Sequence, residues 1–165
     1  MRNMNSLKVK IIGLLLSSFL FSCNAGKKDE VFVITQAFNV AYNVDVSVND
    51  IDKYFQFPFF NDGLIEYSPN DFVAFLKKTV TSKEDVEKFR KSLKITILES
   101  YPLIDYPNSI VEDEKIVRFI ELIKDKGNYK VLKVSLNSES YIENNKRTYV
   151  ILNSENQKII GIVEF

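Results

Sequence analysis

Histidine and tryptophan are both absent from this chain of 165 residues, and cysteine occurs only once. Without histidine the chain has neither a Ser-His nor a Cys-His nucleophile pair, and it lacks the commonest metal ligand. A single cysteine excludes a disulfide within the chain and a metal site built from several cysteines. Any catalysis would therefore depend on Asp, Glu, Tyr, Lys or Ser, and we expect neither a cofactor nor a metal.

Glycine and proline are also scarce, with five and four residues, whereas 45% of the residues are hydrophobic and 27% are charged. This is the composition of an ordinary folded domain. The bases Arg2, Lys8 and Lys10 precede Cys23 and no acid does, so the part from Cys23 onward carries a net charge of −3. A mildly acidic chain without a basic stripe lacks the electrostatic footprint of a nucleic-acid-binding protein.

The N-terminal segment has the organisation of an export signal. Its bases are followed by an apolar run over 11–21, which is too short to span a bilayer as a helix. Leu20-Phe21-Ser22-Cys23 then resembles the lipobox of bacterial lipoproteins, with Phe21 as a less usual second residue. The resemblance implies cleavage between Ser22 and Cys23, a thioether-linked diacylglycerol on Cys23, and acylation of the new amino group, as with palmitate.

Three segments are therefore expected: a signal peptide over 1–22, a lipidated cysteine with a polar tether over 23–30, and one globular domain over 31–165. Several acyl chains would hold the protein at a membrane durably, because each buried methylene contributes about 0.8 kcal/mol. Lys27-Lys28-Asp29-Glu30 resembles the surface-export signal of some bacterial lipoproteins, although charges are also common in any solvated linker. The expected location is the cell envelope, at the outer membrane, on either its periplasmic or its surface leaflet.

Helical patterns dominate the first two thirds of the domain. Apolar residues recur every three or four positions over 30–42, and a shorter helix through 51–55 would be capped by Ser47 or Asn49 and stopped by Pro58. Further helices are expected after Ser68-Pro69, after Ser82, and over 110–126, where Ser109 and Glu112 form a capping box and Gly127 would supply a left-handed end.

Strand patterns dominate the rest. Asn61-Asp62-Gly63 between two apolar runs predicts a hairpin, with at least two of Phe57, Phe59 and Phe60 in the core. Alternation over 93–97 and runs rich in Val, Ile and Tyr over 129–136, 147–152 and 158–165 predict strands, the last three as an antiparallel meander. The expected fold class is α+β, with N-terminal helices packed on one face of a C-terminal antiparallel sheet.

Three neighbouring segments together resemble the opening of NTF2-like domains: Asp50 to Phe59, the tight turn, and Tyr67 to Phe72. In those domains two helices lead to a Pro-Phe strand, a hairpin and a third helix. The resemblance covers about 30–80 and the closing meander, and it implies a cone-shaped fold. The expected helix at 110–126 departs from it, because the family normally has strands there. NTF2-like domains include isomerases and dehydratases as well as members without catalysis, so the fold alone does not decide the function.

Two groups of acids are candidate sites. Asp50 and Asp52, together with Tyr42 and Tyr54, could form a buried carboxylate–tyrosine site. The interpretation we favour is that these acids simply suit the start of a helix. The second group consists of Glu112-Asp113-Glu114 with the later acids Glu121 and Asp125. It lacks the spacing of a calcium loop and is better explained as a solvated helix face.

The aromatic residues offer one more candidate. Tyr42, Tyr54, Phe57 and Phe59 could line an apolar pocket, although such spacing more often fills a core. Two functions follow from these patterns: a non-catalytic, lipid-anchored module that binds a protein or a small apolar ligand, or an NTF2-like enzyme with an Asp/Tyr site. The first is favoured, and envelope roles such as assembly or immunity factors remain open.

Overall fold

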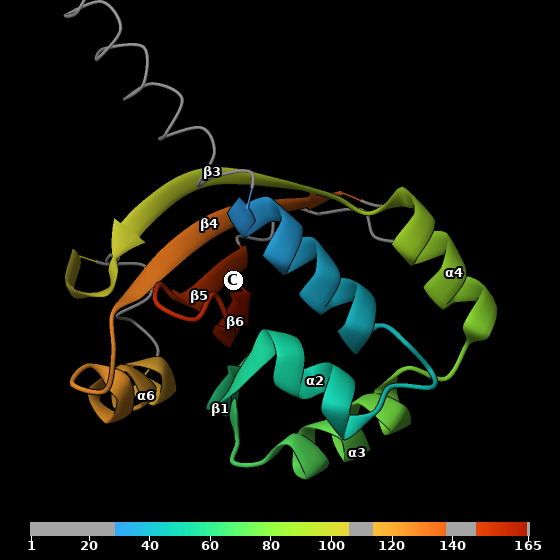
Figure 1. Ribbon diagram of the computed structural model, residues 1–165, viewed down its shortest axis with the longest axis horizontal. Helices are drawn as coiled ribbons and strands as arrows, with labels where there is room; N and C mark the ends of the chain where they lie inside the picture. Colours follow the sequence, from blue (N-terminus) through green and yellow to red (C-terminus); the bar gives the residue numbers. More distant parts are fainter. Residues whose placement is uncertain (1–28, 106–113, 138–147, 165) are drawn as a thin grey trace, which may run out of the picture.

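A computed structural model of the chain describes residues 29–105, 114–137 and 148–164 (Figure 1). Ser22 and Cys23 lie outside the described residues, as does the expected capping box of Ser109 and Glu112. The described chain is α+β, as predicted, with helices concentrated in its first half and four of its six strands in the second.

Serine caps begin three of the helices. After an N-terminal helix over 29–41, the chain forms α2 (Val48–Tyr54), α3 (Pro69–Thr79) and α4 (Lys83–Ser92). In each of the last three, a serine hydroxyl directly before the helix accepts a hydrogen bond from the backbone N–H of the aspartate three residues later. These local caps explain why the starts could be predicted closely.

The hairpin begins earlier than expected. β1 (Phe55–Asn61) follows α2 directly and pairs antiparallel with β2 (Leu64–Glu66). Asp62 and Gly63 have φ angles of 41° and 92°, so both turn residues are left-handed, as an Asp-Gly hairpin turn requires. The prediction that Pro58 stops the short helix is wrong: the helix ends at Tyr54, and Pro58 lies inside β1 after a cis peptide bond.

The sheet contains six strands in the order β2-β1-β6-β5-β4-β3. β3 (Lys94–Pro102), β4 (Tyr129–Asn137), β5 (Thr148–Asn153) and β6 (Ile159–Glu164) form the antiparallel meander. β1 then joins β6 in parallel, so the full sheet is mixed. This single parallel pairing brings the hairpin beside the C-terminal strand.

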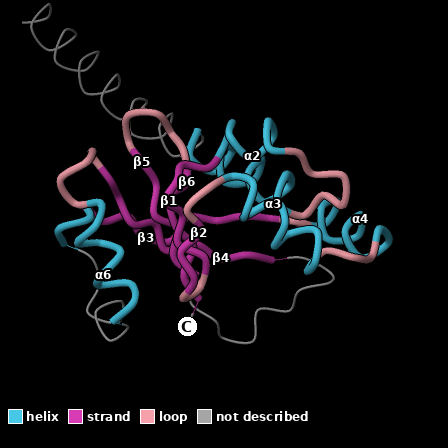
Figure 2. Tube along the Cα trace, turned by 90° about the horizontal axis from the view of Figure 1, so that it is seen from below, coloured by secondary structure: helices cyan, strands magenta, loops and turns pink. Residues whose placement is uncertain are grey.

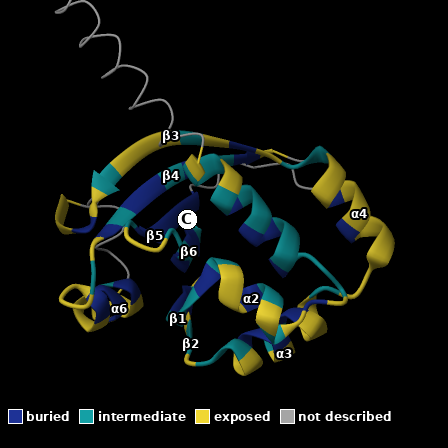
Figure 3. Cartoon of the chain, in the orientation of Figure 1, coloured by how far each residue is buried: buried dark blue, intermediate teal, exposed yellow. Residues whose placement is uncertain are grey.

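Both faces of the sheet carry an apolar core. The N-terminal helix, α3 and α4 pack on one face around Phe55, Phe59 and alternate residues of β4 and β5, and α6 (Glu114–Ile123) packs on the other face around Phe60 and Phe119. Figure 2 shows the sheet between these two layers. The expectation that the helices share one face is therefore wrong for α6, and β5 is buried along its whole length, as Figure 3 shows.

Gly127 also differs from its predicted role. Its φ is not in the left-handed region, which in the described glycines occurs only at Gly63. A Cβ on Gly127 would lie 3.0 Å from the Tyr129 hydroxyl, so a side chain at this position would crowd the neighbouring ring. A short 3-10 turn, η1 (Leu103–Asp105), lies at the end of β3.

One ion pair fastens the start of the N-terminal helix to the sheet. The Lys130 Nζ on β4 contacts the Glu30 carboxylate, and both side chains are largely buried. Removal from water makes such a pair less sensitive to salt than the exposed i,i+4 pairs of α4.

Candidate functional site

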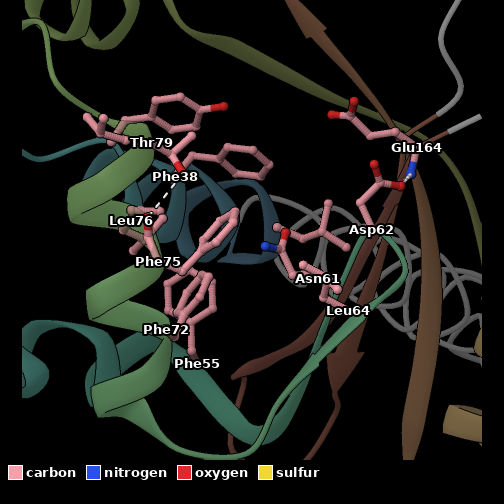
Figure 4. A pocket seen from close by; sticks show the side chains of 14 residues that line it. Phe38, Phe55, Asn61, Asp62, Leu64, Phe72, Phe75, Leu76, Thr79 and Glu164 are labelled. Carbon is pink, nitrogen blue, oxygen red and sulfur yellow. Dashed lines mark hydrogen bonds between the residues drawn. The ribbon is translucent and has the colours of Figure 1, made fainter.

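A cavity of about 400 Å³ opens on the face of the sheet that the N-terminal helix and α3 cover (Figure 4). It lies among the N-terminal helix, α3, the β1–β2 hairpin and the end of β6. Its volume is within the range of small-molecule pockets. Its wall consists mainly of apolar side chains with a few polar ones: Phe38, Ala41, Tyr42, Phe55, Asn61, Asp62, Leu64, Phe72, Phe75, Leu76, Thr79, Val80, Ile162 and Glu164.

The two helices aim their side chains into the cavity because of helical spacing. Phe38, Ala41 and Tyr42 are three and four residues apart, so they share one face of the N-terminal helix and its end. Phe72, Phe75, Leu76 and Thr79 repeat the same spacing on α3. The cavity is therefore the space that two facing apolar stripes leave unfilled.

One end of the cavity is aromatic. The ring of Phe72 lies with its centroid 5.3 Å from that of Phe55 in an edge-on arrangement, and 6.4 Å from that of Phe75 in a nearly parallel one. Phe38 and Tyr42 are also nearly parallel, at 6.4 Å. Figure 4 shows the rings of Phe55, Phe72 and Phe75 together on the α3 side of the cavity.

The opposite end is polar and acidic. Asp62 is at the hairpin turn, and its Oδ1 accepts a hydrogen bond of 3.4 Å from the backbone N–H of Glu164 on β6. The Asp62 N–H in turn donates to the Ile162 carbonyl at 3.0 Å. The β1–β6 pairing thus brings Asp62 next to Glu164 in the wall, and Figure 4 draws Asn61 between these two residues and the aromatic rings.

Tyr42 lies between this cavity and a second one. The neighbouring cavity, of about 280 Å³, extends along the start of α4, and Tyr42, Thr79 and Val80 line both. The Tyr42 ring packs on Phe89 of α4, with centroids 4.3 Å apart. Burial, and secondarily the negative charge of Glu164, raise the pKa of the Tyr42 hydroxyl. The phenol therefore stays protonated at neutral pH and can donate a hydrogen bond.

The predicted pocket residues separate in the structure. Tyr42 lines the cavity, whereas Tyr54 and Phe57 are half-buried against the core and are not part of the wall. Phe59 has no exposed surface and belongs to the core itself. Phe59 and Phe60 are both fully buried and Asp62 is exposed at the turn, so the predicted core role of the hairpin aromatics is confirmed.

The suggested carboxylate–tyrosine site at Asp50 and Asp52 is wrong. Asp50 accepts a hydrogen bond of 2.6 Å from the Ser47 hydroxyl as part of the α2 cap, and this bond lowers the pKa of Asp50. Asp52 is exposed on the same helix. A buried base would have the opposite pKa shift, so the favoured helix-start interpretation of Asp50 agrees with the structure.

The second acidic group behaves as a solvated helix face where it is described. Glu114 pairs with Arg118 one turn along α6, and Glu121 pairs with Lys124. Glu112 and Asp113 lie outside the described residues. Within the described ranges no set of three acidic side chains is grouped closely enough to hold a metal ion.

Most of the wall was not predicted from the sequence, and Asp62, Glu164 and Phe75 are three of the residues that were missed. Phe75 could have been found, since Phe72, Phe75 and Leu76 recur at helical spacing on one face of α3. Asp62 and Glu164 carry no local signal, because they are 102 residues apart and meet only through the β1–β6 pairing.

None of the helices in the described residues is both long and apolar enough to cross a membrane. The chain matches no known protein-family model and no curated protein.

Proposed function

We propose that this protein is a lipid-anchored component of the bacterial cell envelope whose domain binds a small, largely apolar molecule without catalysis. The observation that carries the proposal is the cavity, about 400 Å³ in volume, between two helices and a hairpin. An open pocket of this size with a largely apolar, aromatic wall and a few polar groups has the character of a small-molecule site, so it favours a ligand site.

The anchoring half of the proposal depends on the N-terminal sequence. Cys23 is the only cysteine and lies where a lipobox requires it. The Cys23→Ala variant should lose incorporation of labelled palmitate and leave the membrane fraction. Ser22→Ala is the matched control, since it keeps a small residue before the cysteine and should still be lipidated. Labelled lipid that persists in Cys23→Ala would reject this half of the proposal.

The binding half is tested with a neutral probe, 3-phenylpropanol, added to the full chain in non-ionic detergent. At ten times its Kd the alcohol should raise the melting temperature, followed by circular dichroism, by about 4 °C. Phe75→Ala removes a cavity wall and should abolish the shift. Phe32→Ala is the matched control, because Phe32 is 61% exposed and outside the cavity wall. An equal shift in all three chains would mean that the alcohol binds elsewhere.

An NTF2-like fold is also proposed, on topological grounds. Two N-terminal helices lead into a hairpin, a third helix begins after Ser68-Pro69, and an antiparallel meander closes the sheet. The cavity lies under the helices, where a cone-shaped domain would be hollow. The feature that departs from this pattern is α6, which covers the other face of the sheet.

A carboxylate–tyrosine enzyme is the second candidate, in a changed form. Glu164 faces Tyr42 closely enough for its charge to affect the phenol, and a protonated tyrosine beside a carboxylate suits proton transfer at a carbon next to a carbonyl. The test is deuterium uptake from D2O by 4-phenyl-2-butanone. Uptake that is lost in both Glu164→Gln and Tyr42→Phe would favour the enzyme, and uptake at the buffer rate would reject it.

A further inference from the structure

We propose that the ligand is a molecule with one long, unbranched alkyl chain, which occupies both the cavity described above and the smaller one beside it. This inference rests on the proposed ligand-binding function and specifies the class of ligand. It depends on the position, size and apolar wall of the second cavity, and not on the charge at either end of the site.

The second cavity continues the first. Tyr42, Thr79 and Val80 line both, so the two cavities meet along one strip of wall, where the N-terminal helix and α3 end and before α4 begins. The second cavity alone, at about 280 Å³, is slightly smaller than most ligand pockets, whereas the two together provide about 680 Å³, which is well within the usual range. The pair is therefore better described as one elongated site that passes Tyr42.

Apolar surface extends from one cavity into the other. The Tyr42 ring lies nearly parallel to that of Phe38 in the first cavity, with centroids 6.4 Å apart, and its centroid is 4.3 Å from that of Phe89 in the second. Val86 and Phe89 of α4, which line the second cavity, are both buried. A chain of methylene groups would thus contact apolar side chains along its whole length, and burial of each methylene is favourable.

The polar groups at the junction are used within the protein. The Thr79 hydroxyl donates a hydrogen bond of 3.0 Å to the Phe75 carbonyl, and the Val80 N–H donates one of 2.7 Å to the Leu76 carbonyl. Because these two donors are already satisfied, a hydrocarbon chain that passes them leaves neither one without a partner.

The form of the site favours a flexible chain over a broad, rigid ligand. A ring system can lie in the first cavity, but it would have to pass Tyr42 to reach the second. An unbranched chain can follow the wall past the same ring by rotation about its single bonds. The alkyl chain is therefore the ligand shape that uses both cavities.

The experiment compares 1-hexanol with 1-dodecanol, two uncharged probes that differ only in chain length. Hexanol is short enough to lie in the first cavity alone, whereas the longer chain of dodecanol needs the second. Each alcohol is titrated into the full chain in digitonin, a detergent without an unbranched alkyl chain, and Kd is taken from the melting-temperature shift. Because the alcohols also enter the micelles, the readout is the ratio of the Kd of each variant to that of the wild-type chain at one detergent concentration.

Two substitutions fill the second cavity. Thr81 is exposed and lines this cavity, so Thr81→Trp should close it from its mouth. The Kd of dodecanol should rise at least about tenfold, since each methylene that loses burial costs a factor of about four, and the Kd of hexanol should change less than about twofold. Val86→Phe fills the same cavity from α4, in case the indole of the first variant turns toward water. Lys83→Trp is the matched control, because Lys83 is exposed and lines neither cavity, and it should change neither Kd.

The outcomes separate this inference from the proposed function. If Thr81→Trp and Val86→Phe change the Kd of both alcohols by the same factor, or change neither, the long-chain ligand is refuted while ligand binding stands. A selective loss of dodecanol binding that also occurs in Lys83→Trp refutes it as well, as does a wild-type chain that binds hexanol but not dodecanol. If neither alcohol nor 3-phenylpropanol raises the melting temperature of the wild-type chain, the proposed function itself is refuted.

Discussion

Phe59→Ala should mainly reduce stability, whereas Phe75→Ala should mainly abolish binding. Phe59 has no exposed surface, and its ring centroid lies 5.2 Å from that of Phe55 and 4.8 Å from that of Phe72. Truncation of a buried phenylalanine costs about 3–5 kcal/mol. A loss of about 4 kcal/mol is expected here, because the change also removes these two ring contacts and a third with Phe57 at 6.3 Å.

Phe75 is half-buried and its ring faces an existing cavity, so its truncation enlarges an open space instead of creating a closed void. A loss of about 1 kcal/mol is expected from the smaller apolar area that becomes exposed. Binding of 3-phenylpropanol should show the reverse order: retained in a folded Phe59 variant and lost in Phe75→Ala.

Urea unfolding of the full chain, followed by circular dichroism, measures both free energies. Phe59→Leu is a milder companion variant, with an expected loss of about 1.5 kcal/mol, in case the alanine variant is too unstable to fold. The core role of Phe59 is refuted if Phe59→Ala costs less than about 1 kcal/mol, and the wall role of Phe75 is refuted if Phe75→Ala costs as much as Phe59→Ala.

Four other predictions follow from local features. The raised pKa of the Tyr42 hydroxyl means that the folded state favours the neutral phenol. The free energy of unfolding should therefore be highest below pH 10 and should fall as the pH rises through the raised pKa of the folded state. Tyr42→Phe should reduce this alkaline loss, as measured by thermal melts of the wild-type and variant chains at several pH values. Gly63→Val should cost about 1–2 kcal/mol, because a β-branched residue resists a φ of 92°, and an unchanged melting temperature would contradict this. Ser68→Ala should cost about 1 kcal/mol through loss of the α3 cap, whereas Ser68→Asp should cost little. A soluble piece that starts at Lys27 should unfold cooperatively without added metal, and transitions that differ between two probes would argue against an independent core.

Features specified by neighbouring residues could be predicted from the sequence. The starts of α3 and α4 were predicted from Ser68 and Ser82, because a serine cap and the acid that follows it lie within one turn of helix. The hairpin was predicted from Asp62-Gly63, because only a few residue pairs tolerate two left-handed positions in succession. Each of these signals spans fewer than ten residues.

Features that arise between distant segments could not be predicted in the same way. The parallel pairing of β1 with β6 joins Phe60 to Gly161, and neither strand pattern specifies a partner or its direction. The face of the sheet that α6 covers was also undetermined, because its apolar stripe suits either side. Since the acidic end of the cavity exists only through the β1–β6 pairing, the most informative part of the site was also the least predictable.

The ion pair between Glu30 and Lys130 gains a mechanical meaning under the proposed anchoring. A domain attached to a membrane at Cys23 would receive any tension from its tether at the first turn of the N-terminal helix. The same helix, two to three turns further on, supplies Phe38 and Tyr42 to the wall of the cavity. Because Glu30 is fastened to β4 at the point where the tether enters, force would pass into the central sheet. The wall would then keep its shape while the domain is pulled, and the affinity of the cavity would not depend on how taut the tether is.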